Sequence, residues 1–271
     1  MNEKKKYLVI GNPIEHSLSP QLHNYWIKKN NIKATYDKML VDGKDIESIV
    51  LRVKKNDIHG VNVTVPYKNE IIPFIDQLSP EAEATQSINT IYLSEGRTIG
   101  HNTDIAGFEL SLKKIKYDTN KKKILILGAG GVVPSIIFAL KKMKAFKIIL
   151  SNRTKEKAMN LKNIFDNLTV AEWGELPDFD MIINATSIGL KEGDKFSLDF
   201  KNKGENKFYY DVIYDPYKTD FYEMGNLSNN IFENGLNMFL YQAQKAFSIW
   251  HNVMPEINEE VFKLLKNYEI K

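Results

Sequence analysis

A lysine and an aspartate, found in two polar stretches of the chain, could share one chemical task. Lys68 ends the stretch NVTVPYK (residues 62–68), two positions after Pro66 and a run of β-forming residues. Asp104 ends a second polar stretch, HNTD (residues 101–104). A protonated lysine can donate a proton to a developing alkoxide, while a neighbouring carboxylate pairs with the ammonium and accepts a substrate hydroxyl. The alternative is that Lys68 is a solvated charge at a strand end.

Further polar side chains interrupt otherwise apolar segments of the first part of the chain. They are Ser17 and Ser19 in HSLSP, Thr64 in NVTVPYK, Asn89 in SINTI and Asn102 in HNTD. Each lies at or near a predicted strand end, and ligands of open α/β sheets bind at the carboxyl ends of strands. Hydroxyls, amides, one cation and one anion suit a small, polyhydroxylated, anionic substrate. Each residue alone also has a structural explanation, such as helix capping by Ser19.

A glycine cluster marks a second centre. The sequence ILGAGGVVPS puts Gly128, Gly130 and Gly131 at a turn from a strand into a helix. Glycines there allow a pyrophosphate close to the backbone and leave amide groups free at the helix N-terminus. The match to G-x-G-x-x-G is incomplete, because Val133 occupies the third glycine position. A tight turn without a ligand is the alternative.

The following strand indicates which dinucleotide would bind. Proteins that bind NAD usually have an acid at the tip of this strand, for the ribose 2′-hydroxyl. Here residues 147–150 are followed by SNRTKEK, which places Asn152, Arg153 and Thr154 at the tip and Lys157 one helical turn later. A guanidinium, a nearby cation and a hydroxyl suit a 2′-phosphate. The sequence therefore favours NADP over NAD, although Arg153 could also be a solvated loop charge.

Alternating strands and helices must position these residues. The pattern predicts strands at 7–10, 35–41, 60–65, 90–93, 98–101, 124–127, 147–150, 180–184 and 209–212. It predicts helices at 46–54, 69–78, 80–85, 105–115, 132–142 and 155–164, one capped by Ser19 with Pro20 at its first position, and a mostly helical tail at 238–271 interrupted by Pro255. Such alternation is typical of α/β proteins with a parallel, doubly wound sheet. We expect two α/β domains: residues 1–104, joined by the C-terminal helices 238–271, and a Rossmann-like domain at 105–237.

The composition excludes several classes of protein. The 271 residues are 43% hydrophobic and 26% charged, with a net charge of +3, and the lysines do not form the basic stripe of a nucleic-acid-binding protein. There are no cysteines, and hence neither disulfides nor thiolate metal ligands. No apolar run approaches the length of a membrane span or a signal peptide. We expect a cytoplasmic protein with no metal, membrane or nucleic-acid partner.

Taken together, the motifs resemble those of the shikimate dehydrogenase family over nearly the whole chain. GNPIEHSLSP, GVNVTVPYK, SINTI, HNTD, GAGG, NRT, NATSIGL (184–190) and YDVIY (210–214) occur in one order. The resemblance implies NADPH-dependent reduction of 3-dehydroshikimate to shikimate, a step of aromatic amino-acid biosynthesis. It implies a small-molecule substrate, and a homodimer is compatible with it.

The resemblance also implies roles for individual residues. Lys68 and Asp104 would be catalytic, and the substrate would bind to Ser17, Ser19, Thr64, Lys68, Asn89, Asp104, Tyr214 and Gln242. NADP would bind to Gly128, Ala129, Gly130, Gly131, Asn152, Arg153, Thr154, Lys157, Thr186, Ile213, Gly235 and Met238. Two places depart from the common family pattern: Val132, Val133 and Pro134 are bulkier than usual after GAGG, and Asn237 stands where glycine is usual.

Three other functions are compatible with parts of this pattern. A quinate/shikimate dehydrogenase with relaxed substrate or cofactor choice is the nearest, although the NRT tip argues against NAD. A methylenetetrahydrofolate-type dehydrogenase also joins a lysine-bearing domain to a dinucleotide domain, but gives no reason for SLSP and the other hydroxyl-rich stretches. A non-catalytic NADP-binding sensor would need neither Lys68 nor Asp104.

Overall fold

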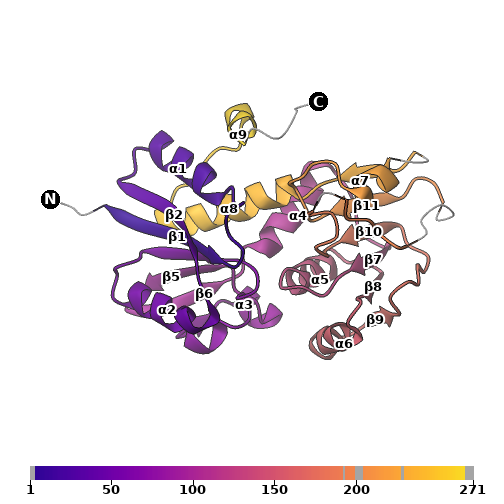
Figure 1. Cartoon of the computed structure of the whole chain (residues 1–271), viewed down its shortest axis with the longest axis horizontal. Helices are drawn as coiled ribbons and strands as arrows, with labels where there is room; N and C mark the ends of the chain where they lie inside the picture. Colours follow the sequence, from indigo (N-terminus) through magenta and orange to yellow (C-terminus); the bar gives the residue numbers. More distant parts are fainter. Residues whose placement is uncertain (1–3, 192, 199–203, 227–228, 266–271) are drawn as a thin grey trace. The chain divides into compact units, whose positions relative to one another are not determined.

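The chain forms two compact units. The computed structural model describes residues 4–191, 193–198, 204–226 and 229–265. The first unit comprises Met1–Gly107 and Leu240–Lys271, and the second comprises Phe108–Phe239 (Figure 1). Helices α4 (Asp104–Lys114) and α8 (Leu236–His251) each begin in one unit and end in the other. Both units are α/β, as the sequence predicts.

The first unit contains a mixed six-stranded sheet. Its strands are β1 (Lys5–Gly11), β2 (Ala34–Leu40), β3 (Gly60–Val63), β4 (Gln77–Leu78), β5 (Thr90–Ser94) and β6 (Arg97–His101). The strand order is β2-β1-β3-β5-β6-β4, and β5 is antiparallel to both of its neighbours. The β5–β6 hairpin turns at Glu95 and Gly96, which both have positive φ, as two-residue hairpin loops require. This sheet is therefore not purely parallel.

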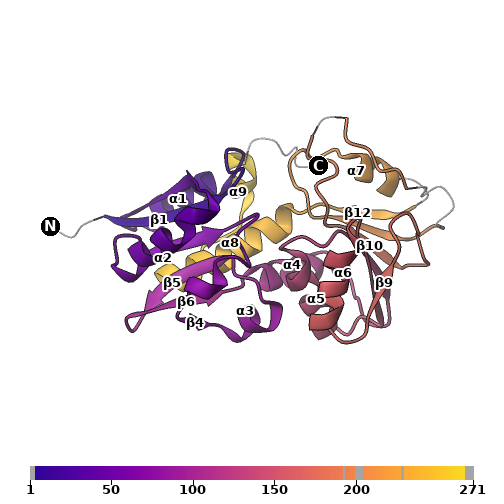
Figure 2. The same cartoon turned by 60° about the horizontal axis from the view of Figure 1, so that its bottom comes forward.

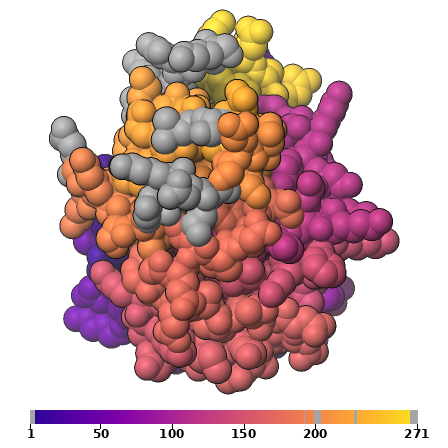
Figure 3. Space-filling view, turned by 90° about the vertical axis from the view of Figure 1, so that its right-hand side faces the viewer, coloured from indigo at the N-terminus to yellow at the C-terminus, as the bar shows by residue number. Residues whose placement is uncertain are grey.

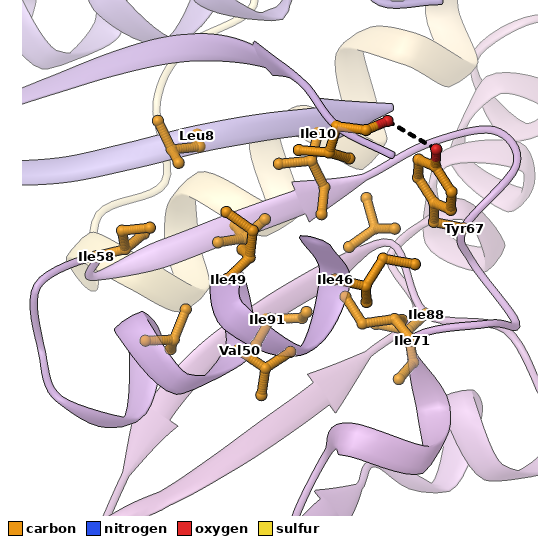
Figure 4. Close-up of a cluster of buried hydrophobic side chains, with 14 of the residues drawn as sticks. Leu8, Ile10, Ile46, Ile49, Val50, Ile58, Tyr67, Ile71, Ile88 and Ile91 are labelled. Atoms are coloured by element: carbon orange, nitrogen blue, oxygen red, sulfur yellow. Dashed lines mark hydrogen bonds between the residues drawn. The ribbon is translucent and has the colours of Figure 1, made fainter. Parts of the chain in front are cut away.

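Helices cover both faces of this first sheet. Side chains alternate along β1, so that Leu8 and Ile10 point to one face, where they meet α2 (Ile46–Lys54) in a cluster of buried aliphatic side chains (Figure 4). Tyr7 points to the other face, where its ring lies 5.1 Å from that of Trp250 on α8. Helix α1 (Ser19–Lys29) also packs on this face (Figure 2). The ring of its Trp26 lies 5.6 Å from that of Phe247 on α8. Burial on both faces gives the strands a rigid frame.

The second unit has the strand order of a dinucleotide-binding domain. Its strands are β7 (Lys123–Leu127), β8 (Lys147–Ser151), β9 (Leu168–Ala171), β10 (Met181–Asn184), β11 (Phe208–Asp211) and β12 (Ile231–Glu233). They are all parallel in the order β12-β11-β10-β7-β8-β9, so that the order reverses between β7 and β10. The helices are α5 (Val133–Lys142), α6 (Lys155–Ile164) and α7 (Asp220–Gly225). The salmon and orange atoms that fill most of Figure 3 belong to this unit. Ligands of such sheets bind at the reversal point.

Several predicted elements differ from the structure. Residues 69–78 are not a helix: they form a short 3₁₀ turn, Ile72–Phe74, and strand β4. Asp76 accepts hydrogen bonds from the backbone and hydroxyl of Thr98, at 2.8 and 2.9 Å, and so holds this segment against β6. The N-cap of α1 is Leu18 rather than Ser19, and β3 ends at Val63 rather than at residue 65.

Other elements were missing from the sequence-based prediction or are shorter than predicted. The sequence did not predict β9, β12 or α7. The tail is helical only in α8 and in α9 (Glu259–Leu264), and residues 266–271 lie outside the described part of the chain. The helices of the described segments are all too short or too polar to span a bilayer.

Candidate active site and cofactor site

Lys68 and Asp104 form a buried ion pair in the first unit. Lys68 Nζ lies 2.5 Å from Asp104 Oδ2, and their side chains are only 9% and 7% exposed. Neither charge would be stable at this depth alone, because desolvation of a single ion costs several kcal/mol, of order 5. The structure therefore contains the Lys68–Asp104 contact that the sequence could not establish, and Lys68 is not a solvated charge at a strand end.

The segment before Lys68 is fixed at both ends. Thr64 continues from β3 by donating its backbone N–H to Ile10 O at 2.9 Å. Tyr67 is 4% exposed, and its hydroxyl donates to Val41 O at 2.7 Å (Figure 4). Lys68 O in turn accepts from Ile88 N at 2.8 Å. The core position of Tyr67 thus fixes the backbone point from which the Lys68 side chain extends.

Asp104 is fixed by its place at the start of a helix. It is the first residue of α4, where a negative charge interacts favourably with the helix dipole. Its backbone N–H donates to Asn102 Oδ1 at 3.1 Å. Asn102 is itself buried, and its Nδ2 donates to Thr85 Oγ1 and Ser87 O, both at 3.0 Å. Asn102 therefore has a structural role that its polar stretch did not reveal.

Asn89 joins this pair from a third segment. Its Nδ2 donates to Asp104 Oδ1 and to Thr103 Oγ1, both at 2.9 Å, and lies 3.4 Å from Gln242 Oε1. Its Oδ1 accepts from Thr103 N at 2.8 Å. Of the predicted substrate-binding residues, Lys68, Asp104, Asn89 and Gln242 thus converge through hydrogen bonds. Asp104 keeps both oxygens occupied, one by a cation and one by an amide.

Asn62 is a polar residue of this region that sequence reasoning missed. It lies in the apolar strand β3 and is 7% exposed. Its Nδ2 donates to Asn89 O at 2.9 Å and to Thr90 Oγ1 at 3.1 Å, and its Oδ1 accepts from the Tyr36 hydroxyl at 2.6 Å. An asparagine between two valines of a central strand is the only signal, because buried polar groups need partners that the sequence does not show.

Ser17, Ser19 and Thr64 lie in the segments that follow the parallel strands β1 and β3. Ser17 Oγ accepts from Ser19 N at 3.3 Å, so the first serine orders the start of α1. Asn12 N, in the loop that leads to these serines, donates to Val65 O at 3.0 Å. The loop after β1 and the turn after β3 are thereby joined.

The glycine turn of the second unit follows β7 at the reversal point of the sheet. Gly128 has a φ of +109°, and a Cβ there would lie 2.5 Å from Ala185 O, in the segment that follows β10. Gly130 is exposed, and a Cβ there would meet nothing closer than 4.0 Å. The first glycine is thus required by the fold, while the second leaves open space at the N-terminus of α5. This cradle fits a pyrophosphate.

The bulky residues after the glycines do not obstruct this cradle. Val133 and Pro134 are buried in the core of the second unit, and Val132 is half-buried. The predicted start of the helix at residue 132 moves by one position, to Val133. These bulkier residues, which depart from the family pattern, are therefore packed inside the unit.

The tip after β8 offers positive charge and hydrogen-bonding groups. Asn152 Nδ2 donates to Thr154 O at 2.7 Å, which shapes the turn. Arg153, Thr154 and Lys157 are exposed, and within the part of the chain that the structure describes no carboxylate pairs with Arg153 or Lys157. Lys155, between them, is instead paired with Glu172. Two cations without a carboxylate partner fit a 2′-phosphate.

The remaining predicted cofactor residues follow β10, β11 and β12. Thr186 donates to Asn184 Oδ1 through its backbone, at 3.0 Å, and through its hydroxyl, at 2.7 Å. Gly235 donates its N–H to Ile213 O at 3.2 Å, and a Cβ there would lie 2.0 Å from Val212 O, so only glycine fits. Met238 is buried in the first turn of α8, and the Tyr214 ring stacks on Phe239 at 4.8 Å.

Asn237 has partners that account for its presence. Its Nδ2 donates to Glu233 Oε1 at 2.6 Å, and its Oδ1 accepts from Lys114 Nζ at 2.9 Å. Burial raises the pKa of Glu233, and the Asn237 amide partly offsets this effect. The asparagine therefore joins β12 to α4 within the second unit, a role that glycine could not fill.

A Rossmann-type sheet in one unit and a buried lysine–aspartate pair in the other define an α/β protein of the dehydrogenase class. Residues 9–91 match the family model of the shikimate dehydrogenase substrate binding domain, and residues 109–191 match that of shikimate / quinate 5-dehydrogenase. The chain belongs to the shikimate dehydrogenase family, which confirms the resemblance seen in the sequence.

Individual relatives agree with this assignment. A shikimate dehydrogenase (NADP(+)) of Pelagibacter ubique (strain HTCC1062) is 56% identical, over 97% of this chain and 99% of the relative. The crystal structure of shikimate dehydrogenase from Aquifex aeolicus is 32% identical with a TM-score of 0.87, covering 97% of this chain and 98% of that one. The Thermus thermophilus enzyme in complex with NADP(H) and shikimate is 27% identical with a TM-score of 0.87, covering 97% and 98%.

Proposed function

We propose that this protein catalyses the reversible, NADPH-dependent reduction of 3-dehydroshikimate to shikimate, a step of aromatic amino-acid biosynthesis. The observation that carries the proposal is the buried Lys68–Asp104 pair, with Asn89 hydrogen-bonded to Asp104 and Gln242 adjacent to Asn89. A sensor that only binds NADP would have no use for a charged pair that costs free energy to bury.

The proposed chemistry assigns the proton to Lys68. NADPH, when bound, supplies the hydride that reduces the substrate carbonyl. Lys68 Nζ, paired with Asp104, donates a proton to the carbonyl oxygen as negative charge develops there. In the oxidation direction the neutral amine accepts the proton back. Asp104 orients the ammonium and accepts a hydroxyl of the substrate.

The other polar residues of the first unit are proposed to bind and orient the substrate. The Ser17 and Ser19 hydroxyls donate to its carboxylate, and Thr64, Asn89 and Gln242 bind its hydroxyl groups. Tyr214 is also proposed to bind the substrate.

NADP is the proposed cofactor, and the second unit supplies its site. The backbone of Gly128, Ala129, Gly130 and Gly131 binds the pyrophosphate. Asn152, Arg153, Thr154 and Lys157 bind the 2′-phosphate end. The residues proposed for the remainder of the cofactor are Thr186, Ile213, Gly235 and Met238.

A spectrophotometric assay of NADPH oxidation tests the proposal. We expect turnover with 3-dehydroshikimate and NADPH, and much slower turnover when NADH replaces NADPH. The second family model also names quinate, so 3-dehydroquinate should be assayed in parallel. Equal rates with both substrates would identify a quinate/shikimate dehydrogenase, and NADPH binding without any turnover would identify a sensor.

The proposed reaction uses a water-soluble substrate and cofactor, and we assign it to the cytoplasm. A homodimer is the assembly to test, and analytical ultracentrifugation of the purified protein would measure it directly.

A further inference from the structure

A carboxylate in the second unit is buried more deeply than the catalytic pair. Asp211 is the last residue of β11 and is 0% exposed. It lies opposite Asn184 in the register of β10 and β11, at the carboxyl edge of the sheet. The proposed reaction assigns it no role, although it belongs to the motif YDVIY.

Three neutral donors surround this carboxylate. Asp211 Oδ1 accepts from Asn184 Nδ2 at 2.9 Å and from Ile213 N at 3.0 Å. Asp211 Oδ2 accepts from Thr219 Oγ1 at 2.7 Å. Both carboxylate oxygens are thus occupied, by groups from three different segments.

Among the described residues, no cation pairs with this carboxylate. Lys191 and Lys218 are the cations of the surrounding segments, and both are exposed. Neither forms an ion pair with Asp211 in the described chain. The other titratable groups there are Tyr210, Tyr214, Asp215, Tyr217, Asp220, Tyr222, Glu223 and Glu233, none of which is cationic. Burial consequently raises the pKa of Asp211 to about 7, although its three donors act in the opposite direction.

The partners of Asp211 lead directly to two proposed cofactor contacts. Asn184 Oδ1 accepts from the backbone and the hydroxyl of Thr186, so its orientation determines that of Thr186. The backbone N–H of Ile213 donates to Asp211 Oδ1, and the carbonyl of Ile213 accepts from the N–H of Gly235. One carboxylate therefore connects the segments that follow β10 and β11.

We propose that Asp211 is a positioning residue for NADP, and that its ionised form is the one that holds Thr186 and Ile213 in their binding positions. This inference rests on the proposed cofactor site. When Asp211 is protonated, the carboxyl becomes a donor to Thr219, whose own proton then loses its acceptor. The hydroxyl of Thr219 also accepts from Tyr222 N at 3.1 Å at the start of α7, so this change reaches a third segment.

The test is the dissociation constant of NADPH, measured by nicotinamide fluorescence across about pH 5.5 to about pH 8.5. Asp211→Asn keeps the shape but mimics the protonated carboxyl. We expect it to bind NADPH about tenfold more weakly than the wild type at the alkaline end, and equally at the acidic end. The cofactor's own phosphate titrates identically in both proteins, so the ratio of the two constants isolates Asp211.

Two substitutions at Thr219 provide the controls. Thr219→Ser keeps the donor and should reproduce the wild-type pH profile. Thr219→Val removes a donor to the charged form, and should move the midpoint of the profile to higher pH.

Each outcome decides the inference. A ratio near one at every pH would show that Asp211 does not position the cofactor, and a constant tenfold ratio would show that its ionisation is not involved. Wild-type protein that binds NADPH with the expected profile but does not reduce 3-dehydroshikimate would contradict only the proposed function. Failure of the wild type to bind NADPH would contradict both.

Discussion

Two buried aspartates, one in each unit, are accommodated by different means. Asp104 is paired with the Lys68 ammonium, so the charge buried in the first unit sums to zero. Among the described residues, Asp211 accepts hydrogen bonds from an amide, a backbone N–H and a hydroxyl, and burial raises its pKa to about 7. The first arrangement pairs the proposed proton donor with a counter-ion. The second, by our inference, makes the connection between two loops sensitive to pH.

Removing one partner of the Lys68–Asp104 ion pair should give the largest loss of stability. Asp104→Ala leaves Lys68 buried without an anion, and we expect the free energy of unfolding in urea to fall by about 3–5 kcal/mol. The double variant Lys68→Met/Asp104→Leu removes both charges and should lose less than the single variant. Equal losses in the two proteins would mean that the pair is not electrostatically coupled.

Substitutions at two of the three glycines of the turn after β7 should separate an effect on folding from an effect on cofactor binding. Gly128→Ala forces a side chain into a positive φ and against Ala185 O, and should lower the free energy of unfolding by about 2–4 kcal/mol. Gly130→Ala meets only open space, so stability should stay within about 0.5 kcal/mol while NADPH binding weakens. Unchanged NADPH affinity in Gly130→Ala would contradict the position assigned to the pyrophosphate.

Cofactor preference should depend on the cation at the tip of β8. Arg153→Ala should lower kcat/KM for NADPH by about tenfold, because a charge-assisted hydrogen bond to the 2′-phosphate is lost, and leave NADH almost unaffected. Lys155→Ala is the matched control, because Lys155 already pairs with Glu172. A loss of similar size with NADH would show that Arg153 does not distinguish the two cofactors.

The pH dependence of stability should have opposite signs for two carboxylates. Lys54 and Thr98 lower the pKa of Asp76 to about 2, so it stabilises the fold above its ordinary pKa, and this stabilisation is lost as the pH falls toward 2. Burial raises the pKa of Asp211, so the wild type should lose stability relative to Asp211→Asn as the pH rises from about 4 to about 7. Urea unfolding of Asp76→Asn and Asp211→Asn at several pH values measures both. Slopes of the same sign would contradict these assignments.

The sequence predicted elements whose signals are local. Residues 46–54 and 155–164 form the predicted helices because each has an apolar stripe at helical spacing. Residues 69–78 did not, because Asp76 binds Thr98, 22 positions later. A helical pattern cannot show such a pairing.

The candidate site could be predicted in its charged members but not in its supporting ones. Lys68 and Asp104 stood out because ionisable residues interrupt apolar segments. Asn62 and Asp211 did not, because their role depends on partners that are distant in sequence, such as Asn89 and Thr219. Nothing in the neighbouring residues identifies those partners.

The most direct test of the central claim is Lys68→Met, assayed with NADPH and 3-dehydroshikimate while shikimate binding is measured by calorimetry. Loss of the proton donor should lower kcat by about 10²–10⁴-fold, with shikimate affinity largely retained. Lys54→Met, at an exposed lysine that pairs with Asp76, should leave both quantities unchanged. Near-normal turnover in Lys68→Met would contradict the assignment of Lys68 as the proton donor.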